Sequence, residues 1–149
     1  MKMEYVAMVR RGWPNGSALD MAETIEAGQT LQNGDWVYKA ADGGVQKVPG
    51  GLTSAVALAG LVMQGNGDSG SATYANKAVV LWSGFVADIS NYDASASYVP
   101  GSPLMTGNTT GGTTGTLTLQ TGSYPIIGYV LNVTPVSAQN TASLTIVVK

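Results

Sequence analysis

The chain has 149 residues, no cysteine, no histidine and a net charge of −2. These counts exclude disulfides, thiolate metal sites and catalytic arrangements that depend on histidine, and they give no basic face for nucleic acid. Only 11% of the residues are charged and 20 are glycine, which is typical of short strands joined by tight turns and of a surface that meets other protein. We therefore expect one all-β domain.

Residues 1–22 differ from the rest of the chain and are predicted to form an extended N-terminal arm. They contain Arg10, Arg11 and Trp13. If the arm lies on a neighbouring protein, Trp13 is an aromatic anchor and the two arginines pair with carboxylates. The alternative is a terminal strand that packs on the chain's own domain. A short helix over residues 17–27 is also expected, because the chain has a capping-box pattern there.

Targeting signals are not evident in the sequence. Glu4 and the arginine pair interrupt any signal-peptide core, and no run is long and apolar enough to cross a membrane. We therefore expect a soluble product of the cytoplasm that does not bind a membrane.

Residues 23–149 are predicted to form the β domain. Asp42, Gly43 and Gly44 mark a hairpin turn between strands at 36–38 and 45–48. Further apolar strands are expected at the following ranges: 56–64, 126–133 and 144–148. Long polar loops at 90–103 and 106–116 separate them.

The stretch at 76–89 is the most strongly apolar part of the chain. Gly84 interrupts it, so it predicts either one buried strand with a bulge or two strands that meet at a tight bend.

A degenerate internal repeat is visible in the order of these strands. The first unit spans about residues 34–89 and the second about 101–149, each with a Gly-led strand, a turn, a second strand and an apolar pair of strands. Two such units in tandem predict a closed or nearly closed β structure with approximate twofold character.

One segment matches a nucleotide-binding pattern. Residues 65–70 fit G-x-G-x-x-G, but no helical period follows Gly70, and that motif works only where a helix begins. Two acidic pairs, at 23 and 26 and at 88 and 93, are candidate acid–base groups, but Glu23 and Glu26 lie in a polar segment and Asp93 in a polar loop, where solvated roles are expected. The sequence therefore predicts no cofactor, no metal and no enzymatic activity.

Loop tyrosines support a different kind of binding. Tyr92, Tyr98 and Tyr124 lie in or beside loops, where exposed rings stack on sugars or fill protein interfaces.

The glycines and β-branched residues of the domain carry a family resemblance. The relevant stretches are Ile25 to Val37 (IEAGQTLQNGDWV), Ala59-Gly-Leu-Val62, Val79 to Val86 (VVLWSGFV), Gly101-Ser-Pro-Leu104 and Ile127-Gly-Tyr-Val130. This arrangement resembles the capsid decoration, or cement, proteins of tailed bacteriophages, in particular the lambda-type head-stabilising group. The resemblance implies a small β-barrel or β-tulip body with no catalytic residues.

The resemblance also implies a function, which we state as an expectation. A member of this family binds the outer surface of the major capsid protein lattice on the virion and stabilises the shell at capsomer junctions. A homotrimer is the first expectation and a dimer the second. The alternative function is a carbohydrate-binding β module of a tail fibre or spike, for which Tyr92, Tyr98 and Tyr124 are the expected aromatic cluster.

Overall fold

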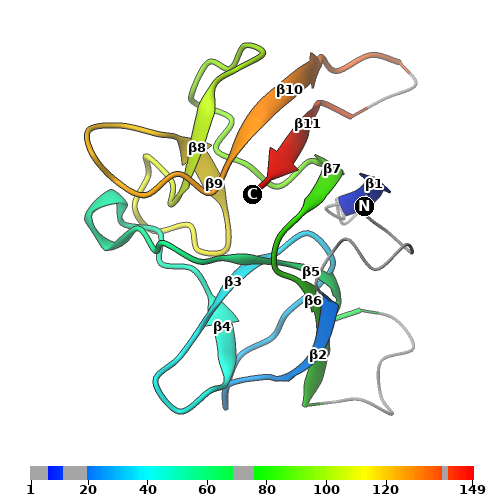
Figure 1. The fold of residues 1–149 in the computed structure, drawn as a ribbon, viewed down its shortest axis with the longest axis vertical. Coiled ribbons are helices and arrows are strands. Elements are labelled where there is room, and N and C mark those ends of the chain that lie inside the picture. The colour runs from blue at the N-terminus through cyan, green and yellow to red at the C-terminus, as the bar shows by residue number, and fades with distance from the viewer. Residues whose placement is uncertain (1–6, 12–19, 69–75, 139–140) are drawn as a thin grey trace.

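Eleven strands form two antiparallel sheets in the part of the chain that the computed structural model describes, which is residues 7–11, 20–68, 76–138 and 141–149. The six-stranded sheet contains, in spatial order, β1 (Ala7–Arg11), β7 (Phe85–Ile89), β11 (Ser143–Val148), β10 (Gly128–Thr134), β8 (Pro103–Thr106) and β9 (Leu117–Leu119). The five-stranded sheet contains β2 (Asp20–Thr24), β6 (Lys77–Leu81), β5 (Gly60–Gln64), β3 (Trp36–Lys39) and β4 (Val45–Lys47). Figure 1 shows the six-stranded sheet in the upper half of the molecule and the five-stranded sheet in the lower half.

The all-β prediction is confirmed. The only helical element of the described residues is a short 3-10 turn at Leu52–Ser54. The predicted helix over residues 17–27 is wrong where the structure describes it, because Asp20–Thr24 is strand β2, paired along its whole length with β6. Tertiary pairing outweighs the local capping signal there. Within the same described residues, no helix has the length and apolar character that a membrane span requires.

The apolar stretch around Gly84 forms two strands. β6 ends at Leu81 in the five-stranded sheet, and β7 begins at Phe85 in the six-stranded sheet. Gly84 lies between them with a φ of 75°, a left-handed conformation that glycine adopts without steric cost. This bend therefore passes the chain directly from one sheet to the other.

The two sheets have the same strand order once β1 is set aside. β2-β6-β5-β3-β4 in the first unit corresponds strand by strand to β7-β11-β10-β8-β9 in the second. The units that this order defines are 20–81 and 85–148, so their bounds differ from those expected from the sequence. β2, which opens the first unit, lies outside the repeat as the sequence suggested it, and β7, which opens the second unit, was expected at the end of the first.

Matching irregularities support this correspondence. The ladder between β5 and β6 shifts register just after Val62, and the ladder between β10 and β11 shifts just after Val130. Val62 donates its N–H to Asp35 O, and Val130 donates its N–H to Ser102 O, both at 2.9 Å. The two units therefore share a β-bulge and the backbone bonds beside it, in addition to their strand order.

The same register positions build the core of both units. Six matched pairs are half-buried or buried and apolar: Ile25 and Tyr92, Val37 and Leu104, Val45 and Leu117, Val62 and Val130, Ala78 and Leu144, Val80 and Ile146. The first unit's members form a separate apolar cluster, while the second unit's members join the larger cluster that spans both sheets. The hydrophobic pattern thus specifies one module twice.

The five strands of each unit curl until the first and the last in spatial order meet. The residue after β2, Ile25, forms a parallel bridge with Val45 at the start of β4, and Tyr92 after β7 forms the same bridge with Leu117 at the start of β9. Each meeting is a single bridge and not a continuous ladder. The small barrel expected from the resemblance is therefore not a closed barrel in the described residues.

Candidate interaction surface

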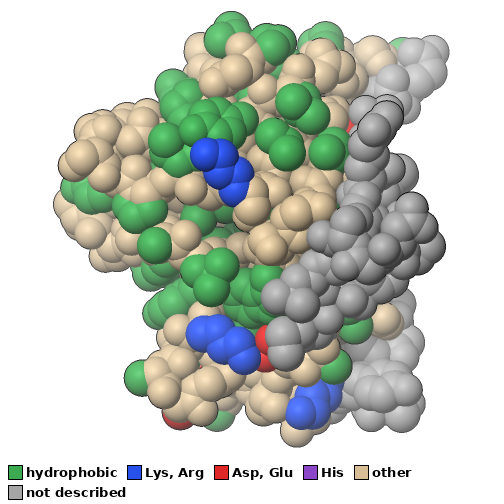
Figure 2. Space-filling model, in the orientation of Figure 1, with side chains coloured by type: hydrophobic (Ala, Val, Ile, Leu, Met, Phe, Trp, Pro, Cys, Tyr) green, Lys and Arg blue, Asp and Glu red, His purple; other side chains and the backbone are tan. Residues whose placement is uncertain are grey.

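An apolar groove lies where the two units meet. It encloses about 110 Å³ and is lined from the first unit by the segment before β5 and the residue after β6, and from the second by the segment before β10 and the end of β11. The lining residues are Ala57, Leu58, Ala59, Trp82, Ile126, Ile127, Val148 and Lys149. Figure 2 shows hydrophobic side chains gathered over the middle of this face.

The lining is matched between the two units. Gly60 pairs with Val37 and Gly128 pairs with Leu104, so the residues two positions earlier, Leu58 and Ile126, are equivalent. Leu58 is 59% exposed and Ile126 is 39% exposed. Their successors, Ala59 and Ile127, are both buried. Each unit therefore contributes one exposed branched aliphatic side chain to the rim and one buried apolar residue to the floor.

Close backbone approach fixes these segments at the start of β5 and β10. A Cβ on Gly60 would lie 2.4 Å from Val80 Cγ1 and 2.9 Å from a ring carbon of Trp82. A Cβ on Gly128 would lie 2.3 Å from Val147 O. Only glycine fits at either position, so the residues that precede these glycines are held against the neighbouring strand.

A charged side chain lies on one side of the groove. The ammonium of Lys149 sits 5.0 Å from the centroid of the Tyr129 ring, which is within cation–π range. Lys149 is exposed, and the equivalent position of the first unit is Ser83. Among the described side chains that line the groove, Lys149 alone is charged, so it places a positive charge beside the groove.

A buried polar network holds Trp82, one of the residues that line the groove. Trp82, which lines the groove, donates its indole N–H to Glu23 Oε1 at 3.1 Å, and Glu23 Oε2 lies 2.5 Å from Lys39 Nζ. Glu23 is only 4% exposed. Its negative charge is thus paired with a lysine and hydrogen-bonded to the indole, which makes its burial tolerable.

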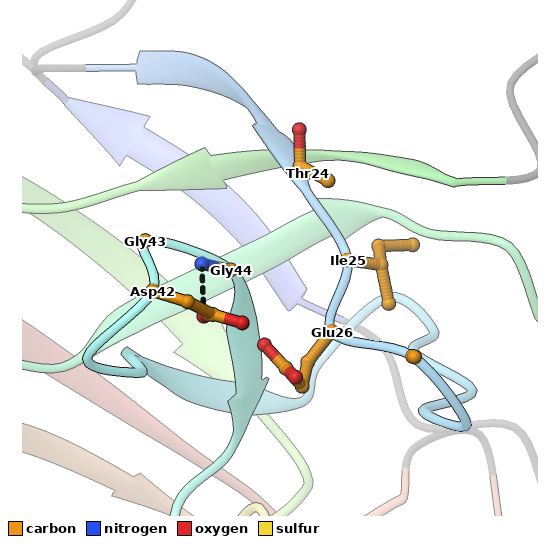
Figure 3. Close-up of a pocket in the computed structure, with 7 residues that line it drawn as sticks. Thr24, Ile25, Glu26, Asp42, Gly43 and Gly44 are labelled. Carbon is orange, nitrogen blue, oxygen red and sulfur yellow. Dashed lines mark hydrogen bonds between the residues drawn. The ribbon is translucent and has the colours of Figure 1, made fainter.

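A shallow acidic pocket lies on the first unit, away from the groove. It is lined by residues 24–27 and 42–44, and in Figure 3 the carboxylates of Glu26 and Asp42 face each other. A hydrogen bond between the two carboxyl groups raises the pKa of Glu26, while the Gly44 N–H lowers the pKa of Asp42. Protonated Glu26 is therefore the donor and the Asp42 carboxylate the acceptor. No cluster of three or more metal-ligating side chains occurs among the residues that the structure describes.

The second unit holds a carboxylate at the position of Glu26. Asp93 is buried, and it accepts hydrogen bonds from the Ser95 N–H and hydroxyl, the Thr109 N–H and the Thr118 hydroxyl. Burial acts to raise the pKa of Asp93, but these hydrogen bonds outweigh it and hold the pKa below its ordinary value. Asp93 therefore fastens two long loops to β9 and has no lone pair aimed at a ligand.

The residues expected at an interface are placed only in part. Arg10 and Arg11 belong to β1, which pairs antiparallel with β7, so residues 7–11 follow the alternative of a terminal strand on the chain's own domain. Their side chains and the whole of Trp13 lie outside the described residues. The structure does not bring the three together at a described surface.

The tyrosines expected to bind sugar are engaged in packing. Tyr92 and Tyr98 meet edge to face, with ring centroids 5.4 Å apart, and Tyr98 donates its hydroxyl to Asp93 O at 2.6 Å. Burial raises the pKa of both phenols. Tyr124 is half-buried in the loop before β10. The three rings do not form an exposed aromatic platform.

The glycine-rich pattern at 65–70 has a structural role where it is described. Asp68 accepts from the Gly65 and Asn33 N–H groups, and Asn66 accepts from Leu31 N–H and donates to Gln29 O. This turn fastens the end of β5 to the loop before β3. No helix of the kind that binds a dinucleotide begins within residues 65–68, the part of this pattern that the structure describes.

The groove was not predicted from the sequence. Leu58 and Ile126 read as ordinary apolar residues ahead of strands, and a single exposed leucine carries no signal. An alignment of the two repeats on Gly60 and Gly128 would have shown that Leu58 and Ile126 are equivalent positions. Comparison with protein-family models, with curated proteins and with solved structures finds no match to this chain.

Proposed function

We propose that this chain is a structural β protein that binds the outer surface of a phage capsid lattice and stabilises the shell at capsomer junctions. The major capsid protein is its partner, and the assembled virion is its location. The proposal assigns the chain no catalytic activity and no cofactor. It extends the sequence resemblance described above.

The observation that carries the proposal is the exposed apolar groove on a rigid scaffold. Leu58 and Ile126 project from segments that glycine contacts hold in place, so little conformational entropy is lost when a partner covers them. Two further exposed aliphatic residues, Val99 and Leu131, lie on the second unit. A protein whose task is contact area needs such a surface, and many copies on a symmetric shell add their small contributions.

Binding to capsids tests this proposal. Purified protein is mixed with expanded capsids that lack it, taken from the phage that encodes the chain, and bound protein is measured by co-sedimentation. We expect saturable binding and a higher temperature of capsid opening. An unrelated all-β protein of similar size is the control. Absence of co-sedimentation, with the chain shown to be folded by circular dichroism, would contradict the proposal.

The arginines of β1 are tested separately. Arg10→Ala combined with Arg11→Ala removes two charges expected to pair with carboxylates, so occupancy on capsids should fall and its salt dependence should weaken. Lys77→Ala, on β6, is the matched charge-removing control. Unchanged occupancy would remove the arginines from the interface without affecting the rest of the proposal.

A further inference from the structure

We propose that the groove at the junction of the two units is the partner-binding surface, and that one chain sits on a local twofold axis between two identical partner subunits. This inference rests on the proposed function, because it needs a partner that is a symmetric lattice. It replaces the expected homotrimer by a single chain whose two units act as two protomers.

Internal symmetry is the first step of the argument. Strand order, the β-bulge after Val62 and Val130, and the closing bridges at Ile25 and Tyr92 are the same in both units. One chain therefore presents two near-copies of the same scaffold. Such an object suits a partner that also presents two copies of one surface, as a twofold interface of a symmetric assembly does.

The position of the groove is the second step. Its lining comes in equivalent pairs from the two units, Leu58 with Ile126, Ala59 with Ile127, and Trp82 with Val148. Equivalent residues can line one small groove only if the approximate symmetry axis of the molecule passes close to it. A partner docked there consequently meets the same chemistry on both sides.

Side chains at some other register positions differ between the units. Val79 on β6 corresponds to the buried Thr145 on β11, and the exposed Ala22 on β2 corresponds to the half-buried Asp88 on β7. Leu58 and Ile126, by contrast, are both exposed and both branched aliphatic. A contact that uses both side chains accounts for this agreement.

The groove also defines the partner's chemistry. About 110 Å³ holds no more than the tips of one or two aliphatic side chains, so each of the two partner subunits would insert one. Lys149 beside the groove tolerates a carboxylate on one of the subunits. The occupant is thus a pair of apolar loop residues, one from each of two copies of the capsid subunit.

Stoichiometry on capsids tests the inference. If every local twofold is occupied, saturation should give one chain for every two major capsid subunits, and particle density should lie across twofold junctions. The free chain should be a monomer by light scattering. One chain for every capsid subunit, or density on threefold positions, would overturn the inference while leaving the proposed function standing.

Matched variants test the groove itself. Leu58→Asp and Ile126→Asp should each weaken capsid binding at least about tenfold, as central contacts of an interface do. Val136→Asp, at a residue that is 72% exposed and outside the groove, is the control and should bind as the parent does. Equal binding by all three variants, each with an unchanged unfolding midpoint, would overturn the groove as the contact. If neither the unmodified chain nor any variant binds to capsids, the result would instead refute the proposed function.

Discussion

The two units of this protein share one scaffold but differ in how they use its core. In the second unit, Ile89 occupies the position that Glu23 occupies in the first, and Val148 occupies the position of Trp82. Thr106 replaces Lys39. One unit thus has an apolar interior where the other has a hydrogen-bonded ion pair. Both units keep the same strand order, whether the interior at these positions is apolar or contains the ion pair.

The largest expected effect comes from making the second unit resemble the first at one core position. Leu144 is fully buried and corresponds to Ala78. Leu144→Ala should lower the free energy of unfolding by about 2–5 kcal/mol, because the surroundings of the second unit would keep a cavity. Urea unfolding followed by fluorescence measures this. If Leu144→Ala lowers the free energy of unfolding no more than the surface control Thr141→Ala does, the second unit tolerates the smaller side chain of the first unit at this position.

Next in size is the loss of the buried carboxylate in the second unit. Asp93→Asn removes the charge that accepts several hydrogen bonds, and should lower stability at pH 7 by about 1.5–3 kcal/mol. The pKa of Asp93 is below its unfolded value, so its contribution is present above the unfolded pKa and lost as pH falls below it. The parent should lose stability in acid more steeply than the variant. Parallel pH profiles would contradict this.

The polar network of the first unit provides a third comparison. Glu23→Ile copies the second unit but leaves the buried indole N–H of Trp82 without its acceptor, at a cost of about 1–3 kcal/mol. Glu23→Gln keeps an acceptor and should cost less. Lys39→Ala should cost least, because Lys39 is largely exposed and its pairing is screened by water. Unfolding midpoints in a different order would show that the ion pair and not the indole bond is the important interaction.

The smallest effect is expected at the acidic pocket. The pKa of Glu26 is raised, so its contribution to stability is present below the unfolded pKa and is lost as pH rises, which is the opposite sign to Asp93. Glu26→Gln should therefore leave the urea midpoint at pH 7 unchanged or slightly higher. A clear fall in the midpoint would mean that the ionised Glu26 has a favourable partner. Asp42→Asn is the matched variant.

Local signals in the sequence were sufficient where a turn is specified by glycine. Gly84 indicated either a bulge or a bend between two strands, and the structure has the bend. Asp42 with two following glycines correctly predicted the β3–β4 hairpin. Strand β2 was missed because its sequence, Asp20–Thr24, alternates weakly, and its conformation depends on pairing with β6 across the chain. The partner strand of this missed element, β6 at Lys77–Leu81, lies far along the chain.

The candidate surface was harder to predict for a physical reason. Leu58 and Ile126 lie more than one whole unit apart in the sequence, and neither belongs to a strand. Their proximity follows only from the register of two ladders, which hydrophobic periodicity does not encode. Arg10, Arg11 and Trp13 were chosen on residue type alone, and their role stays a prediction.

The way each unit closes on itself has a consequence for crowding. The backbone of Glu26 donates to Val45 on the outer side of β4, and that of Asp93 donates to Leu117 on the outer side of β9. One backbone carbonyl at each of these margins is already occupied by the molecule's own backbone, which hinders another chain from extending either sheet there. Copies packed closely together at high local concentration are thereby less prone to join into amyloid-like fibrils at these two margins.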